Sequence, residues 1–144
     1  MKKILIAVLC AGLLATAWSA EKKSSSVKWE SDVQTAQKTI TGAKKKFIFL
    51  FFTAPAWCGP CRKLESGAIA SAKFVKLAQK NAAVKVDFSD RAKVSEQGQK
   101  LLKDFGVRGF PTMIVLDANG KEKGRIVGYR PEKKFFAELK KLMK

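Results

Sequence analysis

The spacing of apolar residues along the chain divides it into helices and strands. Strands are predicted where apolar residues run together or alternate with polar ones, over residues 27–29, 47–53, 83–89, 113–116 and 123–127. Helices are predicted where apolar residues recur at intervals of three and four, over residues 31–43, 62–80, 95–105 and 131–142. The run 47–53 is apolar up to its last residue, which is typical of a central strand buried on both faces.

Glycine, asparagine and proline mark the ends of these elements. Gly106 follows a helix as a left-handed cap, Asn119-Gly120 predicts a hairpin turn, and Pro131 suits the first turn of the last helix. The order βαβαβαββα predicts an α/β domain with a central mixed sheet. Its first strands are expected to be parallel and its last two to form an antiparallel hairpin, with helices on both faces.

The first twenty residues have the pattern of a secretory signal peptide. Lys2 and Lys3 precede an uncharged apolar run over 4–17, and small residues follow before charge begins at Glu21. We expect cleavage near residues 17–20, a tether with a short strand over 21–30, and a folded domain over 31–144. The alternative is an uncleaved anchor, but the run is short for the ~30 Å of hydrocarbon in a bilayer. The protein is therefore expected in the periplasm or otherwise secreted.

The chain is strongly basic, with 29 Lys and Arg residues against 12 Asp and Glu and a net charge of +17. Loss of the signal peptide would remove only Lys2 and Lys3 from this excess. Such a charge favours acidic partners or weak contact with anionic surfaces. The lysines are scattered rather than grouped with aromatic residues, so no nucleic-acid partner is expected.

Two cysteines remain once the predicted signal peptide, which contains Cys10, is set aside. Cys58 and Cys61 form a lone Cys-x-x-Cys pair, which is either a small structural staple or a redox reagent. The chain has no histidine, which excludes a Cys–His nucleophile pair, and Arg62 after Cys61 excludes a c-type haem site. A zinc site would have only two thiolates, so neither a metal nor a cofactor is expected.

The place of the pair in the predicted topology favours redox chemistry. Cys58 falls where a buried strand meets a helix, and the helix N-terminus would hold the pKa of its thiol below the ordinary value of about 8.5. Cys61 lies one helical turn further on and is expected to be more buried. Cys58 is therefore predicted to attack a substrate disulfide, and Cys61 to resolve the mixed disulfide. Pro60 suits the first helical turn, and Gly59 leaves room for a partner's backbone.

The segment Trp57-Cys58-Gly59-Pro60-Cys61 resembles the active-site motif of the thioredoxin family in full. Residues 105–112 are similar to the family segment that carries a cis-proline, and the resemblance extends over nearly the whole predicted mature chain. It implies a thioredoxin fold with a redox-active Cys58–Cys61 disulfide. It also implies that Pro111 is cis and that the backbone of Phe110 pairs with an extended substrate. Trp57, with Gly59 and Pro60, would complete the substrate-binding surface.

One position departs from the family pattern. Thioredoxins carry a buried Asp on the central strand beneath the cysteines, and this chain has Phe51 and Phe52 there. Lys85 on the next strand falls where the family often has a lysine paired with that Asp. Without such a partner, deprotonation of Cys61 would rely on Lys85 or on water.

These observations predict an exported, monomeric thiol–disulfide oxidoreductase that acts on protein disulfides. The Gly59-Pro60 dipeptide resembles the reducing end of the family, so the protein is expected to be a reductant that draws electrons from a membrane thiol reductase. Two alternatives stay open at this stage. The protein could act as a disulfide isomerase or oxidase, or as a redox-independent peptide-binding module on a thioredoxin scaffold.

Overall fold

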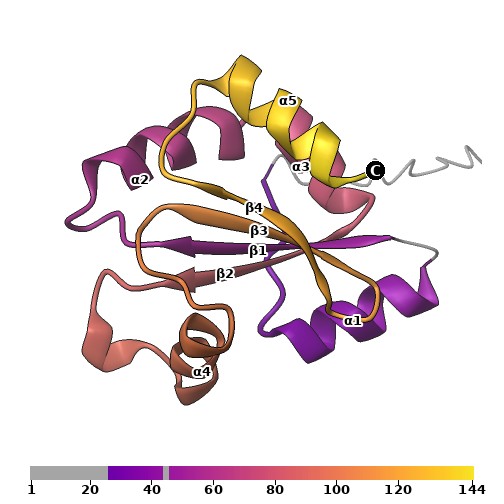
Figure 1. Cartoon of the computed structure of the whole chain (residues 1–144), viewed down its shortest axis with the longest axis horizontal. Helices are drawn as coiled ribbons and strands as arrows, with labels where there is room; N and C mark the ends of the chain where they lie inside the picture. The colour runs from indigo at the N-terminus through magenta and orange to yellow at the C-terminus, as the bar shows by residue number, and fades with distance from the viewer. Residues whose placement is uncertain (1–25, 44–45) are drawn as a thin grey trace, which may run out of the picture.

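A four-stranded sheet forms the centre of the computed structural model, which describes residues 26–43 and 46–144. Helices α1 and α4 cover one face of the sheet, and helices α2, α3 and α5 cover the other (Figure 1). The predicted signal peptide and residues 21–25 of the predicted tether lie outside the described residues. The arrangement is the predicted α/β architecture with helices on both faces.

The strand order in the sheet is β2-β1-β3-β4. Strand β1 (Phe47–Thr53) pairs in parallel with β2 (Ala82–Asp87) and antiparallel with β3 (Thr112–Asp117). Strand β4 (Glu122–Val127) pairs antiparallel with β3 and completes the predicted hairpin. Because β1 lies between two strands and two helical layers, all its residues from Ile48 to Thr53 are buried, as the apolar run predicts.

Capping side chains fix where the helices begin. The Asp32 carboxylate accepts from the Thr35 N–H at 2.7 Å and starts α1 (Val33–Gly42). Ser95 accepts from the Gly98 N–H at 3.0 Å and starts α4 (Glu96–Asp104). Gly106 follows α4 with a φ of +57°, the left-handed conformation predicted for it. The last helix is α5 (Glu132–Leu142), which begins directly after Pro131.

The helix predicted over residues 62–80 is wrong in detail. The single helix expected over 62–80 is divided into α2 (Gly59–Leu64), a π-helical turn (Glu65–Ile69) and α3 (Ala72–Gln79). The division arises because the Ser71 hydroxyl accepts from the Phe74 N–H and starts a new helix. A short 3-10 turn, Arg91–Lys93, also precedes α4.

The strand expected at residues 27–29 is wrong, and one isolated bridge between Glu30 and Val84 stands directly after it. The Glu30 N–H donates to the Ala83 carbonyl at 2.7 Å, and the chain then enters the cap of α1 at Asp32. The cap at Asp32 therefore ends the pairing beside β2 at Glu30. Over residues 26–43 and 46–144, no helix has both the length and the apolar character needed to cross a membrane.

Candidate active site

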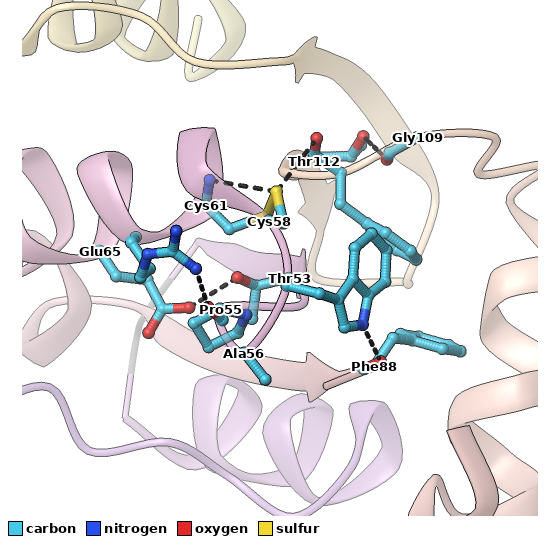
Figure 2. Close-up of a disulfide and its surroundings, with 12 residues drawn as sticks. Thr53, Pro55, Ala56, Cys58, Cys61, Glu65, Phe88, Gly109 and Thr112 are labelled. Carbon is cyan, nitrogen blue, oxygen red and sulfur yellow. Dashed lines mark hydrogen bonds between the residues drawn. A yellow bond between two sulfur atoms is a disulfide. The ribbon is translucent and has the colours of Figure 1, made fainter. Parts of the chain in front are cut away.

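Cys58 and Cys61 form a disulfide at the junction between β1 and α2 (Figure 2). The strand ends at Thr53, and the chain turns sharply because the Trp57 and Cys58 N–H groups both donate to the Ala54 carbonyl, at 3.2 and 3.0 Å. Cys58 is the N-cap of α2, and its Sγ accepts from the Cys61 N–H at 3.2 Å. The sequence-based placement of the pair at a strand–helix junction is confirmed.

The two sulfur-bearing residues differ in burial. Cys61 is fully buried, whereas 8% of Cys58 is exposed. Cys58 is therefore the more accessible of the two, and Cys61 lies inside the domain. This difference agrees with the order of roles expected from the sequence, with Cys58 on the substrate side and Cys61 behind it.

The loop before β3 lies opposite the disulfide. The peptide bond between Phe110 and Pro111 is cis, as the family resemblance implies. The Phe110 carbonyl oxygen lies 3.8 Å from Cys58 Sγ, close enough for a reduced Cys58 thiol to donate a weak hydrogen bond. The Thr112 hydroxyl donates to the Gly109 carbonyl at 2.8 Å, and the Gly128 N–H donates to the Pro111 carbonyl at 2.8 Å.

One backbone N–H group of the cis-proline loop is available to a bound partner. Within residues 26–43 and 46–144, the Phe110 N–H has no hydrogen-bond acceptor. Phe110 is only half-buried, so a docked partner could supply one. A backbone donor beside a reactive sulfur is the feature that an extended peptide strand uses when it docks.

Trp57 stands on the surface beside the disulfide, with 52% of the residue exposed. Its indole Nε1 donates to the Phe88 carbonyl at 3.1 Å, and its ring meets the Phe110 ring edge-on at a centroid distance of 5.9 Å. Phe88 also stacks on Phe110, with 5.1 Å between ring centroids. Sequence reasoning missed Phe88, because only the folded chain brings the end of β2 next to the cis-proline loop.

Gly59 and Pro60 form the first turn of α2, and Pro60 is exposed. A Cβ added at Gly59 would come no closer than 3.7 Å to any atom, the Arg62 Nη2. The free protein therefore has room for a side chain at Gly59. The expected need for glycine there, which concerns a bound partner, stays a prediction.

A carboxylate follows the buried cysteine by four residues, and sequence reasoning missed it. Glu65 begins the π-helical turn four residues after Cys61, and its Oε1 accepts from the Thr53 hydroxyl at 2.6 Å (Figure 2). Its Oε2 lies 3.6 Å from Lys85 Nζ. The expectation that Lys85 has no carboxylate partner is wrong, because the partner comes from the helix and not from the central strand. The helical spacing of Cys61 and Glu65 is the signal that could have found it.

Lys85 is held on two sides. Besides Glu65, its Nζ lies 5.7 Å from the centre of the Trp29 ring, which stacks on Phe51. The side chains of Lys85 and Glu65 are 30% and 24% exposed, so solvent reaches the ion pair. The Glu65 carboxylate is thus held between the end of β1 and Lys85 of β2, where solvent reaches it.

Comparison with known proteins agrees with this geometry. A family model described as a thioredoxin-like domain matches residues 33–143. The disulfide bond reductase DsbH of Chlamydia pneumoniae is 30% identical over 113 residues, which cover 75% of this chain and 66% of that protein. The thiol:disulfide interchange protein DsbD of Campylobacter jejuni is 31% identical over 111 residues, 77% of this chain and 18% of that protein.

A solved structure of a DsbH oxidoreductase is similar in fold. Its TM-score is 0.66 at 27% identity, and the match covers 82% of this chain and 85% of that chain. The chain spans less than two thirds of the length of the two curated relatives named above.

Proposed function

The chain belongs to the family of thioredoxin-like domains, and from this membership we propose that it is an exported thiol–disulfide oxidoreductase that reduces protein disulfides. The observation that carries the proposal is the Cys58–Cys61 disulfide at a strand–helix junction, facing a cis-proline loop. The closure of this disulfide between residues three apart adds little stability, because the loop is short. A redox role explains the pair better than a structural one.

The reaction begins from the reduced pair. The Cys58 thiolate attacks one sulfur of a substrate disulfide, a mixed disulfide forms, and the other substrate sulfur leaves as a thiolate. The Cys61 thiolate then attacks Cys58 Sγ and releases the second substrate sulfur. Two electrons have passed to the substrate, and Cys58 and Cys61 are left joined by a disulfide. An external dithiol must reduce that disulfide before the next cycle.

Substrate docking follows from the surface around Cys58. An extended substrate segment would pair with the Phe110 N–H and lie against the exposed Trp57 ring, with the Pro111 loop on its other side. Gly59 and Pro60 would face the substrate backbone at the start of α2. The exposed indole supplies apolar contact at little conformational cost, since it is already held by its bond to the Phe88 carbonyl.

We further propose that Glu65 takes the proton from Cys61, directly or through one water molecule. The helical spacing directs both side chains to one side of the helix. The Thr53 hydroxyl and Lys85 ammonium hold the Glu65 carboxylate in place, at 2.6 and 3.6 Å. Because the ion pair is partly exposed, the proton can pass on to solvent. Lys85 therefore acts by positioning Glu65 rather than by accepting the proton itself.

The direction of the reaction is proposed from the residues between the cysteines. Gly59 and Pro60 add neither charge nor a hydrogen-bond donor that would over-stabilise the Cys58 thiolate, so the oxidised form is favoured and the dithiol is a good reductant. The name of the chlamydial relative, a disulfide bond reductase, supports the same direction. The signal-peptide pattern supports export, and a membrane thiol reductase is the donor we propose for that compartment.

A reduction potential, measured by equilibration with thiol–disulfide pairs of known potential, tests this proposal. We expect a value near the roughly −270 mV of thioredoxin. A value near the roughly −120 mV of a strong periplasmic oxidant contradicts the reductant assignment and favours an oxidase or isomerase. A protein that shows no exchange at all would instead be a peptide-binding module.

A further inference from the structure

A hollow of about 290 Å³ lies beside the disulfide, between the end of β2, helix α4 and the cis-proline loop. Its apolar lining comes from four residues of these segments, Phe88, Leu102, Val107 and Phe110. Phe88 and Val107 are buried, and Leu102 and Phe110 are half-buried. The hollow therefore offers a preformed contact for one apolar side chain of a bound segment.

Three exposed cations surround this apolar lining. Arg91 lies in the 3-10 turn, Lys103 in the last turn of α4, and Arg108 in the loop that follows. Within residues 26–43 and 46–144, none of the three makes an ion pair or a side-chain hydrogen bond. No carboxylate lines the hollow.

Two of the nearby acidic residues pair with other lysines. Asp90 lies 3.3 Å from Lys93, and Asp104 lies 2.6 Å from Lys100. Asp87, next to Phe88, makes no ion pair, but no carboxylate of the described residues lies within ion-pair distance of Arg91, Lys103 or Arg108. A ligand that brings negative charge would supply a counter-charge, and a positively charged ligand would be repelled.

Phe110 connects the lining of the hollow to the reactive centre. The ring of Phe110 stacks on Phe88 in the wall of the hollow, and its carbonyl oxygen lies 3.8 Å from Cys58 Sγ. A substrate segment attacked at Cys58 and paired with the Phe110 backbone would therefore place its neighbouring residues over the hollow.

We propose that this hollow is a substrate subsite, which selects protein segments that carry an apolar side chain and acidic residues next to the attacked cysteine. The inference rests on the proposed function, since it assumes that Cys58 attacks protein disulfides. The apolar side chain enters between Phe88 and Leu102, and the acidic residues meet the three cations. Substrates with basic residues at the same positions are disfavoured.

Disulfide-bonded peptides of one parent sequence test the proposal. The parent carries a leucine followed by two variable residues after the attacked cysteine, and these are Glu-Glu, Gln-Gln or Lys-Lys. The pre-reduced protein reacts with each peptide in a single turnover at low ionic strength, so no electron donor is needed. We expect the Glu-Glu peptide to react roughly tenfold faster than the Lys-Lys peptide, with Gln-Gln between them. In 1 M salt, where the Debye length is about 3 Å, the difference should largely disappear.

A triple variant assigns the preference to the hollow. Arg91→Glu, Lys103→Glu and Arg108→Glu together should reverse the order of the Glu-Glu and Lys-Lys peptides. A matched control changes the net charge equally on the opposite face of the sheet. This control carries Lys133→Glu, Lys134→Glu and Lys141→Glu, at three exposed positions of α5. It should keep the wild-type order of the peptides.

Several outcomes overturn the inference. Equal rates for the Glu-Glu, Gln-Gln and Lys-Lys peptides exclude charge selection. Equal shifts in both triple variants place the selection in the overall charge of the protein. A peptide with glycine in place of the leucine should react more slowly, and an equal rate excludes the apolar half of the subsite. Failure of the proposed function looks different, because the Gln-Gln peptide would then not be reduced either. The affinity of a Cys58→Ser, Cys61→Ser protein for the three peptides would still measure the charge preference in that case.

Discussion

The Thr53 hydroxyl donates a 2.6 Å hydrogen bond to Glu65, and this bond joins the end of the central strand to the helix that carries Cys61. Lys85 on the neighbouring strand reaches the other oxygen of the same carboxylate at 3.6 Å. Two neighbouring strands thus hold the carboxylate that follows Cys61 by four residues. The central strand itself has Phe51 and Phe52 at the positions where thioredoxins carry a buried Asp.

The substitution Glu65→Gln should slow the resolution of the mixed disulfide by about a hundredfold near neutral pH, because the proton acceptor of Cys61 is lost while the shape is kept. The first attack by Cys58 should change little. Stopped-flow measurement of the two steps separates them. Asp104→Asn serves as the control, since this carboxylate pairs with Lys100 on the surface of α4. An unchanged resolution rate in the Glu65 variant across pH 6 to 9 contradicts the proposed proton route.

The substitution Lys85→Met should weaken the same step by a smaller factor, about three- to tenfold, since it removes the group that positions Glu65 and leaves the acceptor in place. A merely structural role for Lys85 would lower stability without changing the pH dependence of the resolution step. The pH profile of that step is therefore the measurement that separates the two roles.

Alkylation of the reduced protein with iodoacetamide should modify Cys58 well before Cys61. Cys58 is partly exposed at the start of α2, and Cys61 is fully buried. Peptide mapping after a short reaction at pH 7 gives the ratio of the two products. Equal modification of the two cysteines would contradict the assignment of Cys58 as the attacking sulfur.

The substitution Trp57→Ala should raise the KM for protein substrates several-fold and leave the reaction with small aliphatic disulfides nearly unchanged. The indole is 52% exposed, so its loss should lower the free energy of unfolding by only about 1 kcal/mol. Urea unfolding provides the stability measurement. A large loss of stability, above about 3 kcal/mol, would show that Trp57 is mainly a packing residue.

The cap of α1 gives a pH-dependent stability. Hydrogen bonds from Ser31 and from Thr35 lower the pKa of Asp32 from 3.8 to about 2. A carboxyl whose pKa is lower in the folded state stabilises the fold above its unfolded pKa, and this stability is lost as the pH falls from about 4 through 2. Asp32→Ala should therefore cost about 1 kcal/mol at pH 6 and much less at pH 2. Urea unfolding at the two pH values checks this, and an equal loss at both would contradict the role of the charged cap.

Local sequence features were enough to predict most of the fold. The apolar run of β1, the Asn119-Gly120 turn and the cap at Gly106 each act within a few residues, so their patterns can be read directly. The division of the helix expected over 62–80 was missed because it depends on one side-chain bond, from the Phe74 N–H to the Ser71 hydroxyl. A helical spacing of apolar residues continues across that break and hides it.

The two cysteines of the candidate site were predicted from the sequence, whereas the neighbouring residues Glu65 and Phe88 were not. Cys58 and Cys61 follow from a contiguous motif with a fixed spacing. Glu65 and Phe88 are brought to the site by contacts between separate elements of the fold. Glu65 accepts a hydrogen bond from Thr53, 12 residues away, and Phe88 accepts one from Trp57, 31 residues away. No local pattern reveals these two bonds, and only the four-residue spacing of Cys61 and Glu65 indicates that their side chains share one side of the helix.

The central claim is that Cys58 attacks protein disulfides and Cys61 resolves the product, and a trapping measurement tests it most directly. The protein with Cys61→Ala is incubated with oxidised protein substrates, and the adducts are mapped by mass spectrometry under non-reducing conditions. We expect mixed disulfides on Cys58 that dithiothreitol releases, and none with the Cys58→Ala variant. An absence of adducts on Cys58, with the variant folded and substrate in excess, would contradict the claim.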